Sequence, residues 1–219
     1  SPMALQGPTA EEVVAHVVGD WVRDLKYFWF RETVISGIPV VVQRSGWSKQ
    51  GGFEIYLRDG TRGADLWNIF REAGQPWGIG PGGPNWCERI ESGLISYGGD
   101  TDAATNPFEV RMGRYVDLDV PDDTVGIAAL RRIAAEGPKR HSLGLVLDGD
   151  APVTPGFTWH PILQDGRKLG DMTNVVFSYR LKRNIGFALI DRRCSIGDRV
   201  TAEIGGVMQP GTLTDLPFL

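Results

Sequence analysis

The chain has 219 residues, of which 42% are hydrophobic and 23% are charged, and its formal net charge at pH 7 is -4. This composition is typical of a soluble globular protein, and the acidic balance gives a nucleic-acid partner no electrostatic support. The longest apolar run is too short to cross a bilayer, and no charged segment followed by an apolar one opens the chain, so we expect cytoplasmic residence.

The first part of the chain predicts short helices and strands. Residues 9–12, Thr-Ala-Glu-Glu, have the pattern of a capping box, and an apolar helical face follows and stops at Gly19. Aromatic and β-branched residues predict strands over 26–35, 38–42 and 53–57, and apolar residues at helical spacing predict a helix over 61–73. Three strands followed by a helix indicate the α+β class.

A glycine- and proline-rich loop, residues 78–84, leads into a helix that we expect to begin at Pro84. Such a loop can cradle phosphate, but it has neither the Gly-Lys-Ser nor the dinucleotide fingerprint, so we interpret it as a turn.

Another helix, with Asp123 as its N-cap, is expected to stop at residues 137–138, Gly-Pro. From His141 onward the pattern changes to short β segments: 142–147, 157–163, 175–179, 186–190, 199–203 and 207–213. Turn signals separate them, which indicates an antiparallel barrel or sandwich. We predict two domains: an α+β domain over residues 1–136 and a β-barrel domain over residues 137–219.

Residues 44–57, Arg-Ser-Gly-Trp-Ser-Lys-Gln-Gly-Gly-Phe-Glu-Ile-Tyr-Leu, form a glycine-rich turn that runs into an alternating strand. Alternation places Glu54 and Tyr56 on one face and apolar side chains on the other. Two interpretations fit this pattern: a small-molecule site, or a surface hairpin with a satisfied carboxylate and an aromatic lid.

Cysteine and histidine are scarce and lack the paired spacing of a metal site, so we expect no structural metal. We interpret Cys87 as a helix core residue and Cys194 as a strand-end residue. His160 is interpreted as a packed barrel residue rather than a catalytic one.

Several segments, in the same order along the chain, match one family pattern. Residues 44–54 match Arg-Thr-Gly-Tyr-Thr-Gly-Glu-x-Gly-x-Glu, and residues 88–94, Glu-Arg-Ile-Glu-Ser-Gly-Leu, are similar to Leu-Arg-Leu-Glu-Ala-Gly-Leu. Residues 4–8 give a third match, and residues 191–218 have the character of a C-terminal barrel. The chain thus resembles the aminomethyltransferase superfamily, which includes the T-protein of glycine cleavage. This resemblance implies a T-protein-like fold, a role for tetrahydrofolate, and structural roles for Arg89 and Glu91.

Within the superfamily the details differ from the glycine cleavage branch. That branch has Ala-Arg-Asp where this chain has Pro-Asn-Trp at residues 84–86, so an arginine that contacts folate there is missing. Residues 19–26, 46–57 and 85–92 closely resemble the dimethylsulfoniopropionate demethylase branch instead. The resemblance implies methyl transfer from a sulfonium to tetrahydrofolate, giving methylthiopropionate and 5-methyltetrahydrofolate.

Carried over position by position, the resemblance implies a set of site residues: Trp21, Trp47 and Tyr56 for the sulfonium substrate, and Glu54, Trp29 and Asn85 for folate. Aromatic faces attract a cation without neutralising it. A carboxylate beside the sulfonium would weaken its electrophilicity, so Glu54 suits the donor edge of the pterin better. A methylsulfonium already carries a good leaving group, so we expect neither a catalytic nucleophile nor a metal.

Members of the superfamily are longer, and the resemblance begins partway through the family pattern. We expect the chain to be a fragment, to work with a second chain, or to have lost the reaction. Faces that an upstream segment would cover should then be exposed, which predicts poor solubility alone or association with a partner. Three functions stay open: a sulfoniopropionate demethylase, an aminomethyltransferase or aromatic O-demethylase of the same fold, and a non-catalytic folate-binding module.

Overall fold

The structure is a computed structural model that describes residues 2–46, 51–83, 85–153 and 158–219. The chain divides into two compact units, Ser1–Asn85 and Trp86–Leu219. This division differs from the predicted domain boundary between residues 136 and 137, which stays a prediction. Residues 86–136 group with the second unit because the helix that begins at Trp86 packs on two strands of the barrel.

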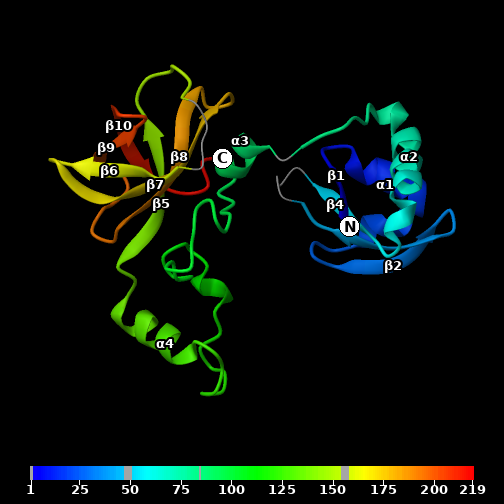
Figure 1. Ribbon diagram of the computed structural model, residues 1–219, viewed down its shortest axis with the longest axis horizontal. Helices are drawn as coiled ribbons and strands as arrows, with labels where there is room; N and C mark the ends of the chain where they lie inside the picture. Colours follow the sequence, from blue (N-terminus) through cyan, green and yellow to red (C-terminus); the bar gives the residue numbers. More distant parts are fainter. Residues whose placement is uncertain (1, 47–50, 84, 154–157) are drawn as a thin grey trace. The chain divides into compact units, whose positions relative to one another are not determined.

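In its described residues, the first unit is a four-stranded antiparallel sheet with two α-helices (Figure 1). The strand order is β1-β4-β3-β2. The elements along the chain are β1 (Pro2–Gln6), α1 (Ala10–Val18), η1 (Asp20–Asp24), β2 (Phe30–Ile35), β3 (Ile38–Arg44), β4 (Gly52–Leu57), η2 (Gly60–Arg62), α2 (Gly63–Ala73) and η3 (Gln75–Trp77).

One face of this sheet packs against α1 and α2. The register pairs Leu5 with Phe53 and Val42 with Ile55, and these four side chains are buried in one core cluster with apolar residues of both helices. The residues that alternate with them point to the other side, which we call the open face: Ala4, Phe30, Glu32, Val34, Val41, Gln43, Glu54 and Tyr56. The open face therefore carries both Glu54 and Tyr56.

The predicted capping box at the start of α1 is wrong. Thr9 occupies the N-cap position, but its side chain makes no capping hydrogen bond. The two glutamates bind arginines instead, Glu12 with Arg23 at 2.8 Å and Glu11 with Arg44 at 2.6 Å. Charge-assisted bonds of this kind are stronger than a bond to a neutral backbone donor, so the carboxylates turn toward the guanidinium groups.

Other boundaries in this unit are closer to expectation. α1 ends at Gly19 as predicted, where a φ of 97° suits glycine. The strand predicted over 26–35 begins only at Phe30, because Phe28 has a φ of 65°, which a strand does not accommodate. Pro84, the predicted start of the next helix, lies outside the described residues.

The second unit contains a closed antiparallel barrel (Figure 1). Outside the gap at 154–157, its elements are α3 (Trp86–Glu91), η4 (Gly113–Tyr115), α4 (Ile127–Glu136), β5 (Arg140–Leu147), β6 (His160–Gln164), β7 (Arg167–Ser178), β8 (Arg183–Asp191), β9 (Arg199–Ile204) and β10 (Val207–Thr214). The six described strands follow the order β10-β5-β8-β7-β6-β9 around the barrel. The predicted α+β fold with a C-terminal β-barrel is confirmed, and the strands form a barrel rather than a sandwich.

A buried ion pair fastens α3 to this barrel. Arg89 is fully buried and donates to Asp100 at 2.5 Å. Asp100 also accepts hydrogen bonds from the side chains of Thr173, at 2.9 Å, and Asn174. These neighbours lie at a β-bulge in β7, which lets two consecutive side chains reach one carboxylate.

Glu91 adds a second connection between α3 and β7. Its carboxylate accepts a hydrogen bond from Ser178 at 2.6 Å and one from the thiol of Cys87 at 3.3 Å. Burial and the adjacent Glu91 carboxylate raise the pKa of Cys87 to about 11, so this thiol stays protonated at neutral pH. Arg89 and Glu91 thus hold α3 on the barrel, the structural role that the resemblance implied.

The predicted N-cap of α4 is wrong. α4 begins at Ile127 after Gly126, which has a φ of 81°, and no side chain caps the helix. Asp123 lies before this turn because Arg131 on α4 pairs with Asp122 at 2.5 Å and so holds the preceding segment beside the helix. No helix among the described residues has the length and apolar character needed to cross a membrane.

Candidate functional site

Glu54 and Tyr56 meet on the open face of the first unit. Both lie on β4, where the register places Glu54 between Ala4 and Gln43 of the neighbouring strands. The hydroxyl of Tyr56 donates a hydrogen bond to Oε2 of Glu54 at 3.1 Å. The structure thus brings together two of the predicted site residues, one assigned to the substrate and one to folate.

The same carboxylate oxygen has a second donor. Ser45, in the turn after β3, is 4% exposed, and its hydroxyl donates to Oε2 of Glu54 at 2.5 Å. Glu54 itself is only partly buried. Its carboxylate is therefore held from within the protein and still faces the open side of the sheet.

The turn that carries Ser45 is fixed by side chains from other elements. Gln6 donates to the carbonyl of Ser45 at 3.1 Å, and the hydroxyl of Tyr27 donates to the carbonyl of Gly46 at 2.9 Å. A Cβ added to Gly46 or Gly52 would overlap the side chain of Gln6. At Gly52 the new Cβ would also overlap the backbone carbonyl oxygen of Leu5, so close approach requires glycine there, whereas at Gly46 only the flexible end of the Gln6 side chain would have to move.

Burial and the hydrogen bond to Glu54 raise the pKa of Tyr56. The phenol therefore stays neutral at physiological pH. A neutral aromatic ring beside the carboxylate offers a π-face to a cation without adding a second negative charge.

Trp21 lies on the other side of the sheet. It packs against the core cluster under α1, and its Nε1 donates to the carbonyl of Val18 at 2.6 Å. The guanidinium of Arg31, which the register of β2 points away from the open face, stands 4.7 Å from the centre of the Trp21 ring. The structure does not bring Trp21 together with Tyr56, and a cation already covers its ring.

The remaining predicted site residues do not contact Glu54 or Tyr56 in any described interaction, or they lie outside the described residues. Trp29 is 58% exposed just before β2, with the ammonium of Lys26 4.9 Å from its ring centre. Asn85 is exposed at the end of the first unit. Trp47 lies outside the described residues.

Sequence reasoning missed Ser45, Gln43 and Phe30. Gln43 sits directly opposite Glu54 in the ladder, and Phe30 lies beyond Gln43 on β2 with 65% of its surface exposed. Pairing the two predicted strands on their alternation could have located Gln43 and Phe30. No local pattern marks Ser45, because its role depends on how the turn folds toward β4.

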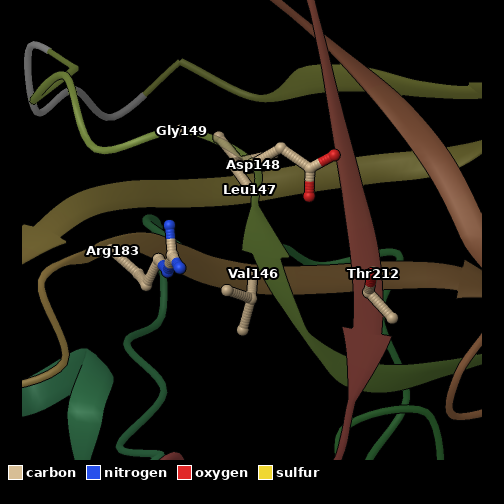
Figure 2. Close-up of a pocket in the computed structure, with 6 residues that line it drawn as sticks. All are labelled: Val146, Leu147, Asp148, Gly149, Arg183 and Thr212. Carbon is tan, nitrogen blue, oxygen red and sulfur yellow. The ribbon is translucent and has the colours of Figure 1, made fainter.

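A pocket of 340 Å³ lies in the second unit, at the ends of β5, β8 and β10 (Figure 2). Its lining residues are Val146, Leu147, Asp148, Gly149, Arg183 and Thr212. Arg199 already pairs with Asp148 and donates to Thr212 at 2.7 Å, so two of its polar groups are bound within the protein. None of the predicted site residues that the structure describes lines this pocket.

In the residues that the structure describes, no group of three or more His, Cys, Asp or Glu side chains could hold a metal ion. Cys194 is buried directly after β8, and burial raises the pKa of its thiol. His160 begins β6 and lines a second pocket, of 310 Å³.

The chain matches two family models, the GCVT N-terminal domain over residues 1–120 and the glycine cleavage T-protein C-terminal barrel domain over residues 140–219. It is 38% identical over 216 residues to "Dimethylsulfoniopropionate demethylase DmdA" of Ruegeria pomeroyi, covering 98% of this chain and 58% of the relative. It is 31% identical over 220 residues to an aminomethyltransferase of Caldanaerobacter subterraneus subsp. tengcongensis, covering 99% of this chain and 58% of that protein.

A solved structure shares the fold. The crystal structure of the glycine cleavage system aminomethyltransferase T from Bartonella henselae superposes with a TM-score of 0.76 at 22% identity, covering 100% of this chain and 59% of that one. The chain thus spans less than two thirds of the proteins that it matches. On the match of the family model to residues 1–120, more than half of its length, this chain belongs to the aminomethyltransferase superfamily.

Proposed function

We propose that the chain is part of a tetrahydrofolate-dependent methyltransferase that moves a methyl group from dimethylsulfoniopropionate to tetrahydrofolate, giving methylthiopropionate and 5-methyltetrahydrofolate. The observation that carries the proposal is the carboxylate of Glu54, held by Ser45 and Tyr56 on the open face. The higher identity to the demethylase than to the aminomethyltransferase favours the sulfonium as methyl donor.

The carboxylate of Glu54 on the open face suits the donor groups of a pterin. A pterin is flat and presents ring N–H and amino donors along one edge, and the carboxylate of Glu54 is an acceptor for such donors. Among the described residues, no donor reaches Oε1 of Glu54. In this proposal Oε1 accepts from the ligand while Oε2 stays bound within the protein.

The reaction needs alignment more than chemical activation. Tetrahydrofolate, when bound, would supply N5, to which the methyl group moves as the C–S bond breaks and its electron pair stays on sulfur. The proton of N5 then leaves to solvent, which gives neutral 5-methyltetrahydrofolate and a neutral thioether. Because the leaving group is a neutral thioether, holding the two reactants in line is enough, and no side-chain nucleophile takes part. In this proposal Tyr56 and Trp47 contact the sulfonium, each with about 0.5 to 2 kcal/mol of cation–π attraction.

Trp21 has no place in this site as we propose it, because it packs on the helix side of the sheet with Arg31 over its ring. Trp29 and Asn85 keep their assignment to folate as part of the proposal. The same proposal includes a small-molecule methyl donor and a cytoplasmic location. It also includes completion of the site by polypeptide beyond these 219 residues.

A second candidate is an aminomethyltransferase, because several relatives with that name match nearly the whole chain. The identity of the folate product separates the two reactions. The same assay also distinguishes an aromatic O-demethylase, which forms product from a methoxylated aromatic acid, and a non-catalytic folate-binding module, which forms none.

The first test is to incubate the purified chain with tetrahydrofolate and, in separate tubes, dimethylsulfoniopropionate, a methoxylated aromatic acid and an aminomethyl donor, and to identify the folate product by mass. Appearance of 5-methyltetrahydrofolate with the sulfonium alone supports the proposal. Product from another donor moves the assignment to that reaction, and no product in any tube shows that these 219 residues do not suffice for catalysis.

Glu54→Gln tests the folate assignment directly. Loss of a charged acceptor should weaken tetrahydrofolate binding by about tenfold to a hundredfold. Glu32→Gln is the matched control, because Glu32 is a carboxylate on the same open face that pairs with Arg58 at 2.5 Å on the sheet surface. If Glu54→Gln leaves the affinity within twofold of the parent, the assignment of Glu54 to folate is wrong.

A further inference from the structure

We propose that Ser45 is a positioning residue of this site, which orients the carboxylate of Glu54 so that Oε1 is presented to the donor edge of the pterin. This inference rests on the proposed function for its ligand. It assigns a role to a turn serine that touches Glu54 from within the protein and acts through it.

The carboxylate of Glu54 can rotate unless hydrogen bonds hold it. The terminal torsion of a glutamate side chain is broad, so an isolated carboxylate samples many orientations. In this site two donors converge on one oxygen: Ser45 at 2.5 Å and Tyr56 at 3.1 Å, both on Oε2. Both bonds form at once in only a narrow range of carboxylate orientations, so the other oxygen, Oε1, has a defined direction.

The position of Ser45 is itself determined by the fold. The residue is 4% exposed, although it lies in a turn, and its carbonyl accepts a hydrogen bond from Gln6 at 3.1 Å. Gln6 reaches it from β1, and the space for that side chain exists because residues 46 and 52 are glycines. The backbone of Ser45 is therefore anchored by a second strand, independently of Tyr56.

The two donors have different contacts with solvent. Tyr56 is 36% exposed on the open face, where we propose that the substrate binds, whereas Ser45 is buried below the carboxylate. Ser45 is thus the donor that solvent does not reach, and we assign to it the constant part of the orientation of Glu54, which the bond from Tyr56 completes.

The test compares Ser45→Ala with Ser45→Thr in the parent chain and in Glu54→Gln, with tetrahydrofolate affinity measured by isothermal titration. Ser45→Ala should weaken binding about tenfold, and Ser45→Thr, which keeps the hydroxyl, should stay within threefold of the parent. In the Glu54→Gln background, Ser45→Ala should change the affinity by less than twofold, because its effect passes through the carboxylate. An equal loss in both backgrounds indicates a merely structural role and overturns the inference, as does no loss in the parent.

A ligand-independent readout separates this inference from the proposed function. The four proteins to compare are the parent, Ser45→Ala, Glu54→Gln and the double variant, each unfolded in urea and followed by tryptophan fluorescence. Ser45→Ala should change the equilibrium constant of unfolding at least threefold more in the parent than in Glu54→Gln. If that coupling is absent, Ser45 does not hold Glu54 and the inference fails, even if the parent binds folate. If the coupling is present but the parent binds no tetrahydrofolate, Ser45 does hold Glu54, but the assignment of Glu54 to folate in these 219 residues fails, and the inference that Ser45 presents Oε1 to a pterin fails with it.

Discussion

Removing one partner of the buried pair Arg89–Asp100 should destabilise the second unit more than removing one partner of an exposed ion pair. The side chain of Arg89 is 0% exposed and that of Asp100 is 2% exposed, so neither charge has water to replace its partner. Removing one member of a buried pair costs about 3 to 5 kcal/mol, because the other charge stays buried. For Arg89→Met we expect the lower end, about 3 kcal/mol, since Asp100 keeps donors from Ser96, Thr173 and Asn174.

The assay uses Cys194 as a reporter of this unit. Its side chain is buried and its thiol pKa is raised by burial, so it reacts with an alkylating agent only when the unit opens. Pulse labelling across a urea series, read by mass spectrometry, gives the unfolding midpoint of the second unit. With a slope of about 2 kcal/mol per molar urea, a loss of about 3 kcal/mol lowers the midpoint by about 1.5 M.

Arg199→Met is the matched control for this prediction. Arg199 pairs with Asp148 in the same unit, but the two side chains are 55% and 48% exposed, so its loss should lower the midpoint far less than the loss of Arg89. The reasoning is refuted if Arg89→Met lowers the midpoint no more than Arg199→Met does.

Two further predictions concern the first unit and the pH dependence of the second. Gly52→Ala should destabilise the first unit by about 1 to 3 kcal/mol, because the new Cβ would overlap the carbonyl of Leu5. Gly60→Ala is the control, because the space around Gly60 is open. Urea unfolding followed by tryptophan fluorescence measures both variants, and equal midpoints contradict the prediction. Burial, together with the positive charge of Arg111, lowers the pKa of His141 below 6.5. As the pH falls below 6.5, the unfolded chain therefore binds a proton at this imidazole that the folded chain does not bind, and the stability of the folded chain decreases. His141→Gln should remove that part of the loss between pH 7.5 and 5.5 in the Cys194 labelling assay, and an unchanged loss in the variant rules out His141 as its source.

The parts of the fold that follow from local pattern were predicted well. Alternation along residues 53–57 predicted that Glu54 and Tyr56 share a face, and the register confirms it because side chains alternate regardless of what surrounds a strand. The helix stop at Gly19 was likewise local. The barrel strands were found as segments, but β7 is longer than predicted, since its first half, with Arg167, Lys168 and Asp171, has the polarity of a turn.

The parts that depend on distant partners could not be predicted in this way. The predicted capping box does not form, because Glu11 and Glu12 pair with arginines that lie further along the chain. The sequence does not show which face of the sheet α1 covers, because packing between distant segments decides it. The assignment of Trp21 to the same site as Tyr56 could therefore not be checked from the sequence. Ser45 had no signal because its acceptor lies nine residues along the chain and comes within reach only when the turn is folded.

The barrel and the sheet differ in what their outermost strands expose. Each described barrel strand has a hydrogen-bonded neighbour on both sides, whereas in the described part of the first unit β1 and β2 each have a neighbour on one side only. A free strand edge is a template for adding another strand, and charged side chains such as Arg31 and Glu32 oppose that addition. With Phe30 and Val34 exposed along β2, self-association by strand addition on concentrating the protein should start at this edge rather than in the closed barrel.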